Sequence, residues 1–317
     1  MAKAYDVITF GDTCVDLVLT DRDMMPEFGQ KEKIIKDYSI EMGGSCCIFA
    51  SQIAKLGLRT AVLGKLGSDE LSGIIKSTLE SLNVSTQYLK GNEDIKTGLT
   101  VVLNKIVDRG MLTYNGTISA AGIDDFDERL YLNTRHFHIG SYFLMTGLQK
   151  HYPFLIDRLK ENGTTVSLDT NWDPEGNWDS GLWDILPKID VFLPNENELM
   201  AITQKNTVDK AIDKIKDIIP VIAVKRGKAG ASVYYEGKRY DADSLNMPVI
   251  DTIGAGDSFD GGFIYSLLRG YSIEDCLKVA CICGSYSVRV QGGIKGQALI
   301  KDIIFAAEGK YGLSIKV

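Results

Sequence analysis

The stretch DTIGAGDSFDGGFI, residues 251–264, contains four glycines and three aspartates and turns apolar toward its end. Apolar side chains at Phe259, Phe263 and Leu267 have the spacing of a helix that begins near residue 256. Gly254, Ala255 and Gly256 would then lie at the helix N-terminus, where free N–H groups and the positive end of the helix dipole bind anions. Glycine lets this backbone approach a phosphate without a Cβ clash. The segment therefore predicts an anion site.

Asp257 would stand in the first turn of that helix, beside the bound anion. A carboxylate beside a phosphate fits a general base, which takes a proton from an attacking hydroxyl while the helix end and Mg²⁺ stabilise the transferring phosphoryl group. The alternative is a glycine-rich turn in which Asp257 only caps the helix. Spacing alone does not decide between the two.

Two more carboxylates follow the first apolar run. Asp12 and Asp16 are four residues apart, and as ionised acceptors either one could receive hydrogen bonds from a polyol. Asp16 is the better substrate candidate, because aspartate also ends strands and Asp12 could serve a turn or a cap.

Three further pairs of polar residues occur in or after predicted strands. Asn195 and Glu198 offer oxygen ligands suited to Mg²⁺, usually through water, although Asn-x-x-Glu is also a capping pair. Asp169 and Asn171 close another strand, where ligands collect in α/β proteins, and Asn171 could contact substrate or phosphate. His136 and His138 alternate on a strand, and we expect one to be buried and the other to face the lid or the surface rather than to catalyse.

Short apolar runs alternate with amphipathic segments along the chain, which predicts an α/β fold with a doubly wound, mostly parallel sheet and helices on both faces. Residues 31–41 and 98–114 read as strands without crossover helices, the second folding at residues 108–110 like a hairpin. We expect them in a small antiparallel sheet that covers one edge of the fold and excludes water as a lid. The prediction is one domain, residues 1–317, with lid strands inserted at about 12–41 and 98–118.

Composition limits the partners. The formal net charge is -7 and basic residues form no run, so nucleic acid and anionic membranes are disfavoured and a small metabolite is favoured. No apolar stretch reaches 18 residues, and MAKAYDVITFGD does not resemble a signal peptide, so we expect a cytoplasmic protein. The six cysteines have neither zinc-site nor disulfide spacing, which indicates reduced and mostly buried thiols.

The string DTIGAGD, followed by a helix, resembles the C-terminal signature of the ribokinase-like, or PfkB, carbohydrate kinases. The resemblance implies that Asp257 is the base and that the Gly254–Gly256 backbone forms the anion hole. It also implies the doubly wound fold with a β-lid, ATP and Mg²⁺ as cofactors, and a monovalent cation such as K⁺ as a further one.

Other landmarks of that family follow in order. GDTCVD resembles its first strand, which closes on the sugar-binding Asp16, and GGSCCIFASQIAKLG resembles its diglycine motif, with Gly43 and Gly44 near the sugar. PNENE resembles its NxxE element, which implies that Asn195 and Glu198 lie near Mg²⁺ and phosphate. VKRGKAGA resembles the nucleotide-side strand and turn. The implied nucleotide contacts are Lys225, Gly227, Gly230, Thr252 and Cys281.

Three positions depart from the family pattern. Ile48 stands where many relatives carry an Asn that bonds a sugar hydroxyl, which leaves the sugar open. Asp173 replaces a frequent Arg, which disfavours an acidic keto-sugar, and Cys281 replaces a frequent Asn at the adenine end, which could relax nucleotide preference.

These features predict an ATP-dependent kinase for a primary hydroxyl of a monosaccharide, with the sugar between Asp16 and the lid. One alternative is a nucleoside kinase, for which Phe28, Tyr38 and Tyr114 could form an aromatic stacking platform. The other is a non-catalytic metabolite-binding regulator, which would have no need of a base. Exposed lid edges and an apolar lid face also predict a homodimer through the lids.

Overall fold

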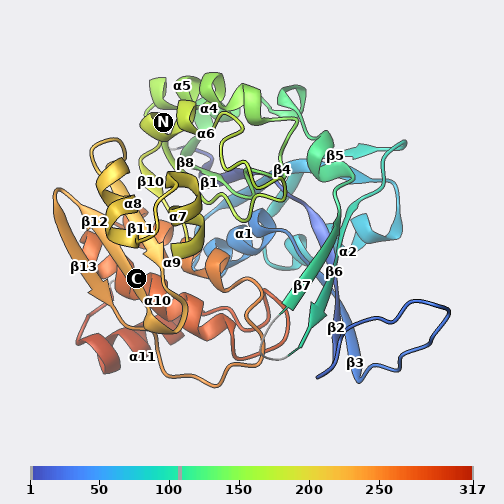
Figure 1. The fold of residues 1–317 in the computed structure, drawn as a ribbon. Coiled ribbons are helices and arrows are strands. Elements are labelled where there is room, and N and C mark those ends of the chain that lie inside the picture. The colour runs from blue at the N-terminus through green and yellow to red at the C-terminus, as the bar shows by residue number, and fades with distance from the viewer. Residues whose placement is uncertain (1–2, 106–108, 316–317) are drawn as a thin grey trace.

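A computed structural model describes residues 3–105 and 109–315. Its main sheet contains β1 (Tyr5–Phe10), β4 (Thr60–Gly67), β5 (Ser85–Asn92), β8 (Thr134–Ile139), β9 (Thr165–Leu168), β10 (Val191–Phe192), β11 (Val221–Lys225), β12 (Ala231–Tyr235) and β13 (Lys238–Ala242). The spatial order of these nine strands is β13-β12-β11-β10-β9-β8-β1-β4-β5 (Figure 1). Neighbours from β5 to β11 pair in parallel, and β12 and β13 continue the sheet antiparallel. The predicted doubly wound sheet is confirmed.

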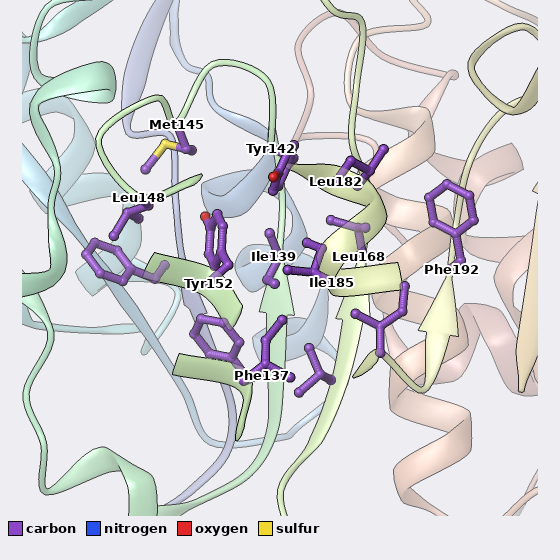
Figure 2. Close-up of a cluster of buried hydrophobic side chains, with 14 of the residues drawn as sticks. Phe137, Ile139, Tyr142, Met145, Leu148, Tyr152, Leu168, Leu182, Ile185 and Phe192 are labelled. Atoms are coloured by element: carbon purple, nitrogen blue, oxygen red, sulfur yellow. The ribbon is translucent and has the colours of Figure 1, made fainter. Parts of the chain in front are cut away.

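Helices cover both faces of this sheet. The longer ones are α1 (Ser45–Lys55), α2 (Glu70–Ser81), α5 (Tyr152–Glu161), α7 (Glu196–Thr203), α8 (Val208–Ile215), α9 (Ala255–Leu268), α10 (Ile273–Ser287) and α11 (Ile300–Tyr311), and the short ones are α3 (Thr117–Ala120), α4 (Leu130–Asn133) and α6 (Leu182–Ile185). Successive residues of β1 point to opposite sides, so Val7 packs with α1, α9 and α10 while Ile8 packs with the α5 and α6 side. In Figure 2, Phe137, Ile139 and Leu168 of the sheet lie against side chains of that second layer.

The second, smaller sheet forms the lid. It contains β2 (Cys14–Thr20), β3 (Asp37–Met42), β6 (Gly98–Asn104) and β7 (Arg109–Tyr114), in the order β3-β2-β6-β7 (Figure 1). The prediction of an antiparallel sheet was wrong in one pair, because β2 and β6 run parallel. The predicted turn was also misplaced: Arg109 and Gly110 already pair within β7, and Asp108 lies outside the described residues.

Two further expectations need correction. Asp16 does not close the first strand of the main sheet, because β1 ends at Phe10 and Asp16 lies on the lid strand β2. His136 and His138 are both buried, and neither faces the lid or the surface. His138 stacks on Phe49 with ring centroids 3.8 Å apart, and burial lowers its pKa to about 3, so this imidazole is neutral.

The cysteines agree with their prediction. All six are buried and none forms a disulfide in the described parts of the chain. Among the helices of residues 3–105 and 109–315, none has the length and apolar character needed to cross a membrane.

Candidate active site

Several polar residues of interest gather at the carboxyl ends of the parallel strands. Asp12 follows β1, Asp169 and Asn171 follow β9, Asn195 follows β10, and Lys225 ends β11. Since neighbouring parallel strands end at the same edge of a sheet, these residues share one region of the molecule, as is usual for ligand sites in α/β folds.

Helices α1 and α9 both begin at this edge, and they differ in what occupies their N-terminal amides. The carboxylate of Asp12 accepts N–H bonds from Ser45 and Cys46, at 2.8 and 3.0 Å, and so satisfies the start of α1. For helix α9, no such side-chain cap is found in residues 3–105 and 109–315. An anion could therefore bind the N-terminus of α9. Asp12, predicted as a substrate contact, has its carboxylate engaged in capping.

Glycine is required at the N-cap of α9. Gly254 has φ 71°, and a Cβ there would lie 2.8 Å from Gly293 Cα and 2.9 Å from Ile48 Cγ2. Both the left-handed backbone and the lack of space exclude larger residues. The loop before it is fixed by Asp251, whose carboxylate accepts from the N–H groups of Ile253 and Gly292, each at 3.0 Å.

Asp257 lies in the first turn of α9 and is 9% exposed. Burial, reinforced by the nearby carboxylate of Asp169, raises its pKa to about 7, although Lys225 and the Ser45 hydroxyl act in the opposite direction. A carboxyl group with such a pKa can accept a proton near neutral pH and release it again.

Lys225 forms a buried ionic cluster beneath this turn. Its ammonium lies 2.8 Å from Asp169 and 3.2 Å from Asp260, and the two carboxylates are almost fully buried. Burial opposes ionisation of Lys225, but Asp169 and Asp260 outweigh it and raise the pKa of the lysine. The carboxylates of Asp169, Asp257 and Asp260 lie close enough together to suit a metal ion, and the Lys225 ammonium already serves two of them as counter-ion.

A cavity of about 740 Å³ opens beside the N-terminus of α9. It is lined by all five residues expected on the nucleotide side: Lys225, Gly227, Gly230, Thr252 and Cys281. The sequence interpretation missed the other wall, which includes residues 244–247, Phe259 and Ser285. A largely apolar pocket with a few polar groups suits a ligand of nucleotide size.

Asn195 and Glu198 adopt the capping arrangement that the sequence left open. The Asn195 side chain accepts from the Glu198 N–H, and Glu198 Oε2 accepts from the Asn195 N–H, both at 2.9 Å. Burial, followed by Asp169, raises the pKa of Glu198 to about 7. A cation nearby would favour the ionised form of this carboxyl group.

Asp16 faces the same region from the lid. Burial, then Asp12 and Asp257, raises its pKa to about 7. A Cβ on Gly43 would lie 2.2 Å from Asp16 Oδ1, and one on Gly44 would lie 2.5 Å from the Asp12 carbonyl oxygen. The diglycine is thus required where α1 and the lid strand approach each other.

Ile48 belongs to a small apolar cluster between the lid and the loop that precedes α9. It is 3% exposed and packs with Val18 and Val102 of the lid and with Ile253. A substrate hydroxyl directed at these four aliphatic side chains would find no hydrogen-bond partner among them.

Asn171, expected to contact substrate or phosphate, bonds to two serines at the site. Its Nδ2 donates to Ser45 Oγ at 2.5 Å and to Ser141 Oγ at 2.8 Å. Asp173 also acts within the loop, where it accepts from the N–H groups of Glu175 and Trp178.

Sequence reasoning did not assign site roles to Ser141, Asp260 or Arg109. The sequence does contain an indication for Asp260: it lies three residues after Asp257 in an apolar helix, so the two side chains fall on the same side of that helix. Nothing in the sequence indicates a role for Arg109, which lies on the lid strand β7. Its Nη1 donates to Thr252 Oγ1 at 3.0 Å, and the two residues are 143 positions apart in the sequence.

Comparison with known proteins identifies the family. The model of the pfkB family carbohydrate kinases matches residues 4–298. A protein of Thermoanaerobacterium thermosaccharolyticum named ATP-dependent 6-phosphofructokinase is 26% identical over 301 residues, which cover 92% of this chain and 90% of that protein. A protein of Halopiger xanaduensis named ATP-dependent ribose-1-phosphate kinase is 29% identical over 274 residues, covering 85% and 88%.

Solved structures support the same fold. Arabidopsis thaliana ribokinase, complexed with ribose and ATP, superposes with a TM-score of 0.79 at 23% identity and covers 96% of this chain and 98% of its own. A double-mutant Vibrio cholerae fructokinase with fructose, ADP and potassium ion superposes with a TM-score of 0.81 at 23% identity, covering 96% and 98%. The chain belongs to the pfkB family of carbohydrate kinases and, as a member of it, is an ATP-dependent sugar kinase.

Proposed function

We propose that this enzyme transfers the γ-phosphoryl group of ATP to a primary hydroxyl of a monosaccharide or sugar derivative. The observation that carries the proposal is the buried carboxyl group of Asp257 beside the uncapped N-terminus of α9. This pairing brings a proton acceptor and an anion site to one point, which phosphoryl transfer to an alcohol requires.

In the proposed reaction, ionised Asp257 accepts the proton of the acceptor hydroxyl as its oxygen bonds to the γ-phosphorus. The bond from that phosphorus to the bridging oxygen breaks, and ADP leaves with the electron pair. The N–H groups of Gly254, Ala255 and Gly256 stabilise the charge on the transferred group. A pKa of about 7 makes Asp257 a sufficient base at neutral pH without keeping it permanently protonated.

ATP would occupy the cavity of about 740 Å³, with its phosphates directed toward α9. Gly227 and Gly230 would contact the nucleotide, Thr252 would lie near the phosphates, and Cys281 would lie near the base. Lys225 contributes positive charge close to Gly256. Its Nζ would lie 3.4 Å from a Cβ atom placed on that glycine.

The donor set fits Mg²⁺. Glu198 and Asn195 provide oxygen atoms of the kind this ion prefers, and the raised pKa of Glu198 indicates a carboxyl group that an added cation would stabilise in its ionised form. When bound, Mg²⁺ would neutralise charge on the ATP phosphates. A K⁺ requirement remains a prediction, supported by the potassium ion in the fructokinase structure.

The sugar would lie between the lid and the diglycine, with Asp16 accepting hydrogen bonds from its hydroxyls and Gly43 and Gly44 close to its ring. The relatives differ in their acceptors: their names include a 6-phosphofructokinase, a ribose-1-phosphate kinase and probable fructokinases. Phosphorylated and free sugars therefore both belong in a substrate screen.

A nucleoside kinase remains the second candidate, since an adenosine kinase from Sinorhizobium meliloti has the same fold, with a TM-score of 0.82. The suggested aromatic platform is not supported. Tyr38 pairs with Leu19 and Tyr114 with Leu99, on the face of the lid opposite to Asp16, and Phe28 is 94% exposed. A non-catalytic regulator is less well supported, because a binding protein has no use for a buried base.

The proposal also covers the location, partners and assembly of the enzyme. We infer a cytoplasmic enzyme that binds neither nucleic acid nor membranes, in keeping with its net charge of -7 and the lack of a basic run. We also infer a homodimer formed through the lids.

The test is a coupled ADP-release assay over pentoses, hexoses, their phosphates and nucleosides, with ATP and Mg²⁺. We expect ADP release above the no-acceptor rate for at least one sugar or sugar phosphate, and a phosphate ester on its primary carbon by NMR. Turnover confined to nucleosides would favour the second candidate, and no acceptor-dependent ADP release would contradict catalysis.

A further inference from the structure

Ser45 lies where the first turns of α1 and α9 meet. The two helices run side by side from their N-termini, because Ile48 of α1 lies against Gly254 and Gln52 lies against Gly261. Gln297 joins them again by donating to the Ile48 carbonyl at 2.8 Å and to Ser258 Oγ at 3.2 Å. Helical side chains point back toward the N-terminus, so the carboxyl group of Asp257 is directed to the end where Ser45 begins α1.

The amide of Asn171 fixes the hydrogen-bond direction of Ser45. Its nitrogen donates to Ser45 Oγ at 2.5 Å and to Ser141 Oγ at 2.8 Å, and an amide nitrogen can only donate. Each serine oxygen therefore accepts from Asn171 and directs its own proton elsewhere. The Ser45 hydroxyl can donate to the nearby Asp257 carboxylate and the Ser141 hydroxyl to that of Asp12, while the Asp12 carboxylate is already engaged by the Ser45 N–H.

Two other observations agree with this direction. The Ser45 hydroxyl lowers the pKa of Asp257 and the Ser141 hydroxyl lowers the pKa of Asp12, in each case against a larger effect of burial. The backbone is also specialised at two of these positions: Asn171 has φ 54° and Ser141 has φ 51°, in the left-handed region that serine seldom adopts.

We propose that Ser45 is a positioning residue for the catalytic base: its hydroxyl donates to one oxygen of Asp257, Asn171 holds it in that direction, and the other carboxylate oxygen is left to face the acceptor hydroxyl. This inference rests on the proposed function, because it requires Asp257 to be the base. It also gives Asn171 a role at the carboxyl end of β9, where its amide bonds Ser45 and Ser141.

The test compares variants of Ser45 and Asn171 with a control variant, using the sugar that gives the highest rate in the ADP-release screen. Ser45→Ala removes the hydroxyl, and Ser45→Thr retains it at a position that is only half buried. Asn171→Asp keeps the shape and tolerates the positive φ, but its carboxylate accepts the Ser45 proton and so turns the hydroxyl away from Asp257. Ser51→Ala is the matched control, because this hydroxyl donates to the Cys47 carbonyl within the same helix.

We expect Ser45→Ala and Asn171→Asp to lower kcat roughly 10- to 100-fold, the value of a hydrogen bond to a charged group, with KM for ATP within about twofold of wild type. The double variant should lose no more than either single variant, since both remove the same interaction. Ser45→Thr should recover most of kcat, and Ser51→Ala should match wild type.

The inference fails if Ser45→Ala keeps the wild-type kcat, if Ser45→Thr is as impaired as Ser45→Ala, or if the two losses add. Asp257→Asn separates this failure from that of the proposed function. An inactive Asp257→Asn with a normal Ser45→Ala overturns only the role of Ser45, whereas an active Asp257→Asn overturns the assignment of the base, and the role of Ser45 with it.

Discussion

The ammonium of Lys225 lies 2.8 Å from Asp169 Oδ2 and so joins the carboxyl end of β11 to that of β9 beneath the first turn of α9. Burial tends to raise the pKa of Asp169, but Lys225 outweighs it and keeps the pKa of this carboxyl group below its usual value. The ion pair thus places one fixed positive charge among carboxylates that would otherwise repel each other and the phosphates of ATP.

The first prediction concerns this ion pair. Lys225→Met should lower the free energy of unfolding by about 3–5 kcal/mol, because it leaves two buried carboxylates without a cation. The loss should shrink as the pH falls, since Asp169 and Asp260 can then be protonated. Urea denaturation at pH 8 and pH 5, with Lys225→Arg as the charge-retaining control, measures both effects. Equal stability of Lys225→Met and wild type at pH 8 would show that the pair is not needed.

The second prediction is the pH dependence of catalysis. Asp257 must be ionised to accept a proton, and its pKa is raised to about 7. We therefore expect kcat to rise about tenfold per pH unit below pH 7 and to level off above it. Steady-state rates at saturating ATP and sugar between pH 5 and pH 9 measure this profile. A plateau that extends down to pH 5 would mean that the base has the pKa of an ordinary carboxyl group.

The sequence allowed the fold to be predicted because the relevant signals are local. Periodicity defined the strands and helices, and the glycines before Phe259 indicated where α9 begins. The orientation of the lid strands could not be predicted, because β2 and β6 pair across a long stretch of sequence and nothing local specifies a parallel pair. The contacts of Asn171 and Asp260 could not be predicted either, because their partners, Ser45 and Lys225 respectively, lie far away in the sequence.

The third prediction concerns the acceptor. Ile48 packs with Val18, Val102 and Ile253, so a hydroxyl directed there would lose a hydrogen bond at a cost of about 1–3 kcal/mol. Ribose and fructose should thus be poor substrates, and compounds with a deoxy position, another configuration or an apolar group near Ile48 should be preferred. Ile48→Asn should shift kcat/KM toward the fully hydroxylated member of matched sugar pairs, and Ile48→Val should not. Wild-type kcat/KM for ribose or fructose at about 10⁴ M⁻¹s⁻¹ or above would contradict this role.

The fourth prediction concerns assembly. The lid face opposite to Asp16 carries only apolar side chains on its four strands, of which Tyr38, Ile40, Leu112 and Tyr114 are 50–64% exposed. A second copy of this sheet would offer a face of the same chemistry, and two such faces pack well in sandwiches. We expect a dimer by sedimentation at micromolar concentration. Ile40→Lys should give monomers, whereas Phe305→Lys, a similar change at an exposed site on α11, should not. A fully active wild-type monomer would count against the lid interface.

The most direct test of the account is the kcat of Asp257→Asn. The amide keeps the size of the side chain but cannot accept the proton, so we expect a loss of roughly 10² to 10⁴ in kcat, with the melting temperature and ATP affinity retained. ATP affinity can be measured by calorimetry on the same preparation, which separates lost chemistry from lost binding. Near-normal turnover by Asp257→Asn would contradict the assignment of Asp257 as the base.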